Sequence, residues 1–104
     1  MVVQQVGVGS LESDVLAFPS PAKAGRTQIG FRIGGGPMSL RFELYDPYGQ
    51  KIYEHEESYE IGYHRIPINE EVLGYTLSVN VYYYLMMDSE KNDVIAKGKF
   101  GVVR

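Results

Sequence analysis

The sequence predicts an all-β fold, an antiparallel immunoglobulin-like β-sandwich of about seven strands. Short stretches of alternating apolar and polar residues are separated by turn residues at intervals of about 8–12 residues. The 104 residues include 12 glycines, 5 prolines and 9 tyrosines, a composition typical of strands joined by turns. No segment repeats apolar residues at the spacing of an amphipathic helix, so we expect fewer than about one residue in ten to be helical.

The run Val79–Met87 (V-N-V-Y-Y-Y-L-M-M) is expected to be the central strand. It contains no charge, glycine or proline, and it is too short to span a membrane. Its β-branched and aromatic residues favour a strand that is covered on both faces. Alternation places Tyr82, Tyr84 and Met86 on one face, and Val81, Tyr83, Leu85 and Met87 on the other.

The chain is divided into an N-terminal linker or edge strand, residues 1–14, and the sandwich domain, residues 15–104. Val2–Gly9 alternates only weakly, and Ser10–Asp14 is polar and loop-like. The segment Phe18-Pro19-Ser20-Pro21 is expected to be extended at a sheet edge, because proline has no N–H to give to a central ladder.

The middle of the chain predicts two clean strands and a hairpin. Gln28–Ile33 directs Ile29, Phe31 and Ile33 inward, and Met38–Tyr45 directs Met38, Leu40, Phe42 and Leu44 inward. Asp46-Pro47-Tyr48-Gly49 has the composition of a type I turn. We expect a returning strand over Gln50–Glu56, with the polar run Glu54–Glu57 marking the point where it leaves the sheet.

The second half predicts two more strands around the central one. Gly62–Ile68 directs Ile66 and Ile68 inward, and Asn69–Tyr75 is expected to be a helical turn or a loop. After a polar hairpin loop at Asp88–Asp93, the last strand, Val94–Val103, carries Lys97 and Lys99 opposite its apolar face. The predicted core is Phe31, Leu40, Phe42, Leu44, Ile66, Ile68 and Phe100.

Composition excludes several functional classes. The net charge of −3 offers no basic surface for nucleic acid or anionic lipid. The chain has no cysteine, which rules out disulfides, thiolate metal sites and cysteine nucleophiles. Met1–Ser10 lacks the features of a signal peptide, so an exported protein would carry this sequence within a longer precursor.

No set of residues predicts catalysis, a cofactor or a metal. His55 and His64 would become cross-strand neighbours, with glutamates nearby, only if their strands paired; we favour a solvated strand end. Gly34-Gly35-Gly36 lacks the following motif and helix of a phosphate loop and is interpreted as a flexible connection. Ser20 and Ser39 have no nucleophile elbow around them.

Six short motifs follow one another along the chain. They are Phe18-Pro19-Ser20-Pro21, Thr27-Gln28-Ile29-Gly30-Phe31, Tyr45-Asp46-Pro47-Tyr48-Gly49-Gln50-Lys51, Gly62-Tyr63-His64, Val81-Tyr82-Tyr83-Tyr84, and a lysine-containing strand that runs from Lys97 to Arg104. In this order they resemble the immunoglobulin-like module of the flagellar hook-capping protein and the related C-terminal sorting domains of bacterial type IX secretion cargo. The resemblance covers residues 15–104, although Ser20 replaces the usual Asn and Asn80 a usual Gly.

The resemblance implies a non-catalytic C-terminal module of an exported bacterial protein, located outside the cell or at its surface. Such a module would act in secretion and surface sorting or in protein–protein interaction, with a neighbouring domain or the export machinery as partner. The residues that carry the family motif would have structural roles: Pro19, Pro21, Tyr45, Asp46, Gly49, Gly62, Tyr82 and Tyr84. Two alternatives stay open, a carbohydrate-binding module that uses the tyrosines and a structural subunit or spacer of a surface assembly.

The candidate interaction face consists of Val81, Tyr83, Leu85 and Met87. A two-sheet sandwich buries only one face of each sheet, so this second apolar face needs another cover. We expect it to dock on a neighbouring domain, on a second copy of the chain, or under the Val2–Val8 segment.

Overall fold

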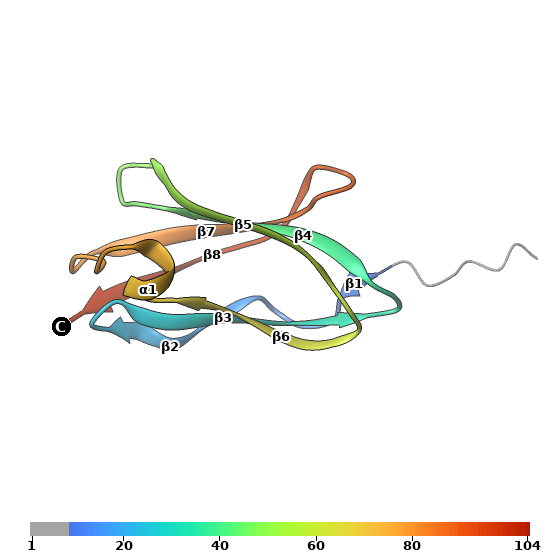
Figure 1. Cartoon of the computed structure of the whole chain (residues 1–104), viewed down its shortest axis with the longest axis horizontal. Helices are drawn as coiled ribbons and strands as arrows, with labels where there is room; N and C mark the ends of the chain where they lie inside the picture. The colour runs from blue at the N-terminus through green and yellow to red at the C-terminus, as the bar shows by residue number, and fades with distance from the viewer. Residues whose placement is uncertain (1–8) are drawn as a thin grey trace, which may run out of the picture.

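A computed structural model describes residues 9–104 of the chain as a sandwich of two β-sheets (Figure 1). The elements are β1 (Ser10–Leu11), β2 (Leu16–Lys23), β3 (Arg26–Gly34), β4 (Met38–Tyr45), β5 (Lys51–Tyr59), β6 (Gly62–Ile68), α1 (Glu70–Leu73), β7 (Val81–Asp88) and β8 (Asp93–Val103). The all-β prediction is therefore confirmed, with four residues in a helix. None of the helices in the described part is long and apolar enough to cross a membrane.

The two sheets contain different strands. Sheet A, the lower layer of Figure 1, pairs β3 with β6 on one side and with β1 and β2 on the other. Sheet B, the upper layer, has the order β5-β4-β7-β8. All these neighbours are antiparallel, but the C-terminal end of β2 pairs with β8 in parallel, Ala22 with Val102 and Lys23 with Val103. This short pairing links the two sheets along one side of the sandwich and is the exception to the predicted antiparallel arrangement.

The core lies between the sheets, where the predicted residues meet. All seven side chains predicted to be core are at most 2% exposed. On β7, Tyr82, Tyr84 and Met86 point inward and are buried. The inward direction of each central strand is therefore the one that its sequence alternation predicted.

The two inward tyrosines of β7 satisfy their hydroxyl groups in different ways. The Tyr82 hydroxyl donates to the Ser78 carbonyl oxygen at 3.0 Å, four residues upstream. This contact at the start of the strand is the tyrosine corner that is typical of immunoglobulin-like sandwiches. The Tyr84 hydroxyl donates to the Val15 carbonyl oxygen at 2.9 Å and so ties β7 to the segment before β2. These bonds let two polar groups be buried without loss of hydrogen bonding.

Several local predictions are confirmed. The Gly49 N–H donates to the Asp46 carbonyl oxygen at 3.0 Å, and Gly49 has a φ of 86°, which glycine adopts without strain. The Asp46 carboxylate also accepts from the N–H groups of Tyr48 and Gln50. Asn69 caps α1 by accepting from the Val72 N–H, so the predicted helical turn is present.

One predicted boundary is wrong. The acidic run Glu54–Glu57 does not end its strand, because β5 continues to Tyr59, which is buried against Phe31. Ser10–Leu11, interpreted as loop-like within the predicted linker or edge strand, pairs with Ile33 and Gly34 of β3 as a short edge strand. The expectation for Val2–Val8 lies outside the described residues.

Phe42→Ala tests the assignment of the inner face. Phe42 is fully buried between the sheets, so we expect the free energy of unfolding to fall by about 3–5 kcal/mol. Urea denaturation measures the change, with Tyr48→Ala, which removes a 90% exposed side chain, as the control. A loss below about 1 kcal/mol for Phe42→Ala would contradict the assignment.

Candidate interaction surfaces

The predicted interaction face lies on the outer side of sheet B. Val81 is 39% exposed and Tyr83 46% exposed, whereas Leu85 and Met87 are half-buried. The expectation that β7 is covered on both faces is therefore wrong for the described residues: the inner face is covered and the outer face is partly open. The open part is the N-terminal half of β7, because Met87 is contacted by the Arg41 guanidinium at 3.1 Å.

A shallow apolar pocket of about 350 Å³ lies within this face. Tyr83 pairs with Lys99, and Leu85 pairs with Lys97, so the two lysines stand beside the two apolar side chains. The backbone of Gly98 forms the floor between them. Neither lysine has an ion-pair partner among the described residues. The pocket thus combines an aromatic and aliphatic wall with a cationic rim.

A buried carboxylate borders the same face. The Glu43 side chain is 8% exposed and lies next to Leu85 in the sheet. It accepts a hydrogen bond from the Tyr45 hydroxyl at 2.6 Å, pairs with Arg41 at 3.1 Å and lies 3.6 Å from the Lys51 ammonium. The Tyr45 bond, followed by the charges of Lys51 and Arg41, lowers the pKa of Glu43 despite its burial. This network holds the β4 side of the face in one arrangement.

Sheet A carries a separate aromatic shelf on its outer face. Phe18 of β2 is 74% exposed and Tyr63 of β6 is 57% exposed, and both line a small pocket over Gly30. A Cβ at Gly30 would come within 2.3 Å of the Tyr63 hydroxyl, so glycine lets the ring lie across β3. The Arg65 guanidinium lies 5.4 Å from the centre of the Tyr63 ring, within cation–π distance.

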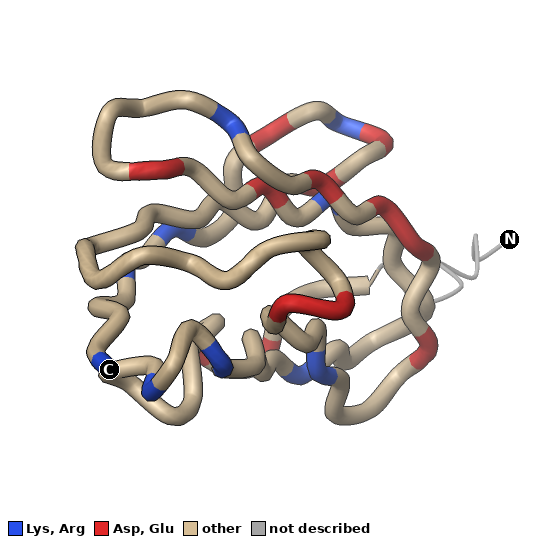
Figure 2. The backbone as a smooth tube through the Cα atoms, turned by 60° about the vertical axis from the view of Figure 1, so that its left-hand side comes forward, with Lys and Arg blue, Asp and Glu red and all other residues tan. Residues whose placement is uncertain are grey.

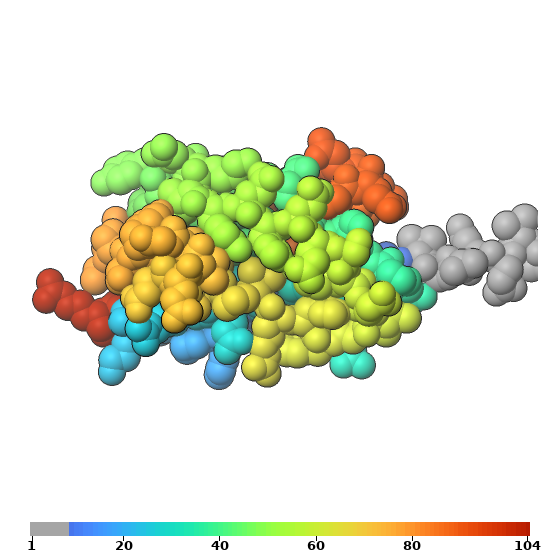
Figure 3. Space-filling model, in the orientation of Figure 1, coloured from blue at the N-terminus to red at the C-terminus, as the bar shows by residue number. Residues whose placement is uncertain are grey.

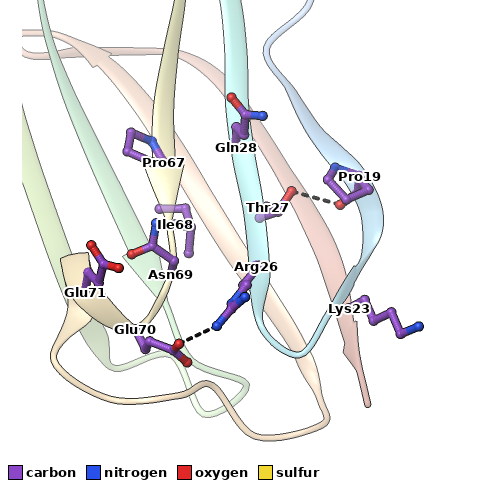
Figure 4. A pocket seen from close by; sticks show the side chains of 10 residues that line it. All are labelled: Pro19, Lys23, Arg26, Thr27, Gln28, Pro67, Ile68, Asn69, Glu70 and Glu71. Carbon is purple, nitrogen blue, oxygen red and sulfur yellow. Dashed lines mark hydrogen bonds and ion pairs between the residues drawn. The ribbon is translucent and has the colours of Figure 1, made fainter.

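A polar pocket of about 530 Å³ lies where β2, β3, the end of β6 and the start of α1 meet (Figure 4). Arg26 pairs with Glu70, and the Thr27 hydroxyl donates to the Pro19 carbonyl oxygen at 2.8 Å. Glu70 also accepts from Thr76, and these bonds lower its pKa. These polar groups therefore satisfy one another, and no nucleophile lies beside a base among the lining residues.

The histidines lie on different sheets. His55 is on β5, which pairs with β4, and His64 is on β6, which pairs with β3. His55 contacts the Glu57 carboxylate at 2.9 Å, and His64 contacts the Glu60 carbonyl oxygen at 2.6 Å. The pairing that would have made them neighbours is absent from residues 9–104, where no group of three or more ligating side chains could hold a metal ion.

The residues of the family motif occupy structural positions. Pro19 and Pro21 lie on β2, Tyr45, Asp46 and Gly49 form the β4–β5 turn, Gly62 begins β6, and Tyr82 and Tyr84 are in the core. The lysine rim and the aromatic shelf were not assigned as sites from the sequence. The alternation of Lys97 and Lys99 beside an apolar strand was the available signal for the first. The shelf had none, because Phe18 and Tyr63 are 45 residues apart in the sequence.

Comparisons with known proteins do not assign a family. Neither a protein-family model nor a curated protein matches the chain. Among solved structures, a β-glucosidase involved in saponin metabolism from intestinal bacteria matches 93% of this chain at 9% sequence identity, with a TM-score of 0.47. The chain spans 16% of the length of that enzyme.

Glu43→Gln should change how stability depends on pH. Because folding lowers the pKa of Glu43 from about 4.5, the carboxylate contributes stability above that value, and this is lost as the pH falls through the folded pKa. We expect the substitution to cost about 1–3 kcal/mol at pH 7 and progressively less towards pH 3. Urea denaturation across this range measures it, with the exposed Glu56→Gln as the control. A cost that stays constant with pH would contradict the role of the charge.

Proposed function

We propose that the chain is a non-catalytic immunoglobulin-like module of an exported bacterial protein that acts in surface sorting or another protein–protein contact. The observation that carries the proposal is the pocket on the outer face of β7 and β8, where Tyr83 and Leu85 lie beside the exposed Lys99 and Lys97. An exposed aromatic ring is the kind of side chain on which protein interfaces concentrate their binding energy. The order of the sequence motifs supports export as the context.

The lysines give this face a specific chemistry. Lys97 and Lys99 can cover an apolar partner with their methylene chains while their ammonium groups stay in water. Val81, and Val103 at the end of β8, extend the apolar surface beyond the pocket and are each 39% exposed. A partner that fits this face presents an apolar centre with acidic groups at its margin, which directs docking as well as stabilising it.

A secretion assay tests the proposal. The chain is fused to the C-terminus of a reporter that carries a signal peptide, and delivery to the surface or medium is measured in a bacterium with type IX secretion. Val81→Lys with Tyr83→Lys should reduce delivery about tenfold or more, because it removes the centre of the interface. Phe18→Lys with Tyr63→Lys, a more exposed apolar pair on sheet A, is the control. Equal delivery of both variants, or no delivery of the unsubstituted fusion, would contradict sorting through this face.

Carbohydrate binding is the second candidate, and the aromatic shelf on sheet A favours it. Phe18 and Tyr63 are exposed aromatic side chains beside the amide of Gln28 and the guanidinium of Arg65. Stacking surfaces with hydrogen-bonding groups at their edge are suited to sugar rings.

A glycan array separates the two candidates. If the shelf binds sugar, Tyr63→Ala should weaken binding about tenfold or more, whereas Tyr83→Ala should leave it unchanged. The absence of any glycan ligand, or the opposite pattern of losses, would exclude the shelf as a sugar site.

A further inference from the structure

The two outer edges of sheet B carry opposite charges at the same spacing. At one edge, β5 presents Glu54 and Glu56, of which Glu54 also pairs with Lys51 of the same strand at 2.7 Å, and at the other, β8 presents Lys97 and Lys99. The register aligns Glu54 with Glu43, Leu85 and Lys97 across the four strands, so these residues share the outer face. Glu56 and Lys99 are two residues further along their strands and lie on the same face. Figure 2 shows the acidic positions along β5, and Figure 3 shows β5 lying across the surface of the molecule.

The backbone groups of the lysine edge point outward. The Val102 N–H donates to the Asn80 carbonyl oxygen at 2.7 Å, so the backbone N–H and C=O groups of Val102 point towards β7. Because these groups alternate along a strand, the backbone groups of Gly98 and Phe100 also point towards β7, and those of Lys97 and Lys99 point away from it. Among the described residues, β2 pairs only with Val102 and Val103 of β8, so no strand pairs with these two lysine positions, although the segment that leads into β2 lines a groove beside them.

The backbone groups of the glutamate edge also point outward. The Ser39 carbonyl oxygen accepts from the Ser89 N–H at 3.0 Å, which directs Ser39 towards the β7 side. By the same alternation, the backbone groups of Phe42 point towards β5, where Phe42 pairs with His55. His55 therefore faces β4, and its neighbours Glu54 and Glu56 face the open edge. Both edges thus offer N–H and C=O groups at the same residues that carry the charges.

We propose that copies of this chain associate head to tail, the β5 edge of one copy adding to the β8 edge of the next. The strand directions in sheet B make this contact antiparallel when successive copies have the same orientation. Lys97 then lies opposite Glu56 of the next copy, and Lys99 opposite Glu54. Each pair exchanges both backbone hydrogen bonds and brings opposite charges together on the same face.

The inner side of this contact has room for the incoming strand. In the same register, His55 of the next copy lies opposite Gly98, which has no side chain. A groove of about 570 Å³ runs beside Gly98, between β8 and the segment that leads into β2. Gly98 is required for packing as well, since a Cβ there would come within 2.4 Å of the Tyr84 hydroxyl.

Charge explains why unlike edges meet and like edges do not. Two β8 edges brought together antiparallel would place Lys97 against Lys99, and two β5 edges would place Glu54 against Glu56. Like charges directly opposite one another destabilise a strand pair, and edge charges are a common protection against such pairing. The contact between unlike edges does not close on itself, so it generates chains of molecules rather than a dimer.

Charge-reversal variants test the proposal by sedimentation velocity and light scattering over a concentration series at low salt. We expect the average mass of the unsubstituted protein to rise with concentration, and added salt to reduce it. Lys97→Glu with Lys99→Glu should weaken association about tenfold or more, and Glu54→Lys with Glu56→Lys should do the same. Circular dichroism melting verifies that each variant is folded.

Recombining the variants separates the proposed contact from a general effect of charge. A chain with all four substitutions keeps the net charge of −3 and should associate again, and a mixture of the two double variants should form mixed assemblies. Lys97→Pro should weaken association about fivefold more than Lys97→Gln does, because it also removes an edge N–H while leaving the β7 pairing intact.

Three outcomes would overturn the proposal. One is an unsubstituted protein that stays monomeric up to about 1 mM, the concentration range of weak but specific contacts. Another is failure of the fourfold substitution to restore association that the double substitutions abolish. The third is association that survives charge reversal but is lost with Tyr83→Lys, which would assign the contact to the outer face instead. The secretion assay is read from Val81 and Tyr83, which the charge-reversal variants leave unchanged, although Lys97 and Lys99 line the Tyr83 pocket as well as the β8 edge.

Discussion

The structure depends on burying the tyrosines of the central strand with their hydroxyl groups satisfied. A phenol buried without a hydrogen bond loses its interactions with water and gains nothing in return. Tyr82 finds the Ser78 carbonyl oxygen within its own segment, and Tyr84 finds the Val15 carbonyl oxygen across the sandwich. The second bond fixes the segment that enters β2. The Tyr84 hydroxyl also occupies the position that a side chain at residue 98 would need. The tyrosines of β7 thereby fix the position of the segment before β2 and require glycine at position 98 of β8.

The inner face of sheet B dictates what its outer face can be. Because side chains alternate, every buried residue of β4, β7 and β8 leaves its neighbours on the other side of the sheet. On β4 these neighbours form the ion network around Glu43, on β7 they are Val81, Tyr83, Leu85 and Met87, and on β8 they are lysines. The outer face is therefore graded, from acidic at β5 through a fixed polar network and an apolar strip to basic at β8. Such a gradient gives the sheet two chemically different edges.

Alternation in the sequence predicted the fold and the core, because successive side chains of a strand point to opposite faces whatever the strand packs against. Ile29, Phe31 and Ile33 needed no knowledge of the partner sheet to be assigned inward. The strand limits were less accessible: the acidic Glu54–Glu57 run resembles a strand end, but β5 tolerates it because the strand is an edge with its outer face in water. The burial of Glu43 was not predicted although its partners are near in sequence, Arg41 and Tyr45 on the same strand and Lys51 across the turn, because alternation only places Glu43 on the outer face. The same holds for the shelf, where β2 and β6 meet only across β3.

The three candidate surfaces occupy different parts of the sandwich. The pocket beside Tyr83 lies on the outer face of sheet B, the shelf of Phe18 and Tyr63 on the outer face of sheet A, and the charged strips along the two sides. Pairing at the edges uses main-chain groups and engages Lys97 and Lys99 at the margin of the pocket, but it does not cover Tyr83, so an assembled chain would still present Tyr83 once per copy. Repetition along such an assembly raises the effective concentration of each face for a partner with several binding sites, without any new contact. A weak contact at a single Tyr83 pocket can therefore be sufficient when the sheet edges set the copies in a row.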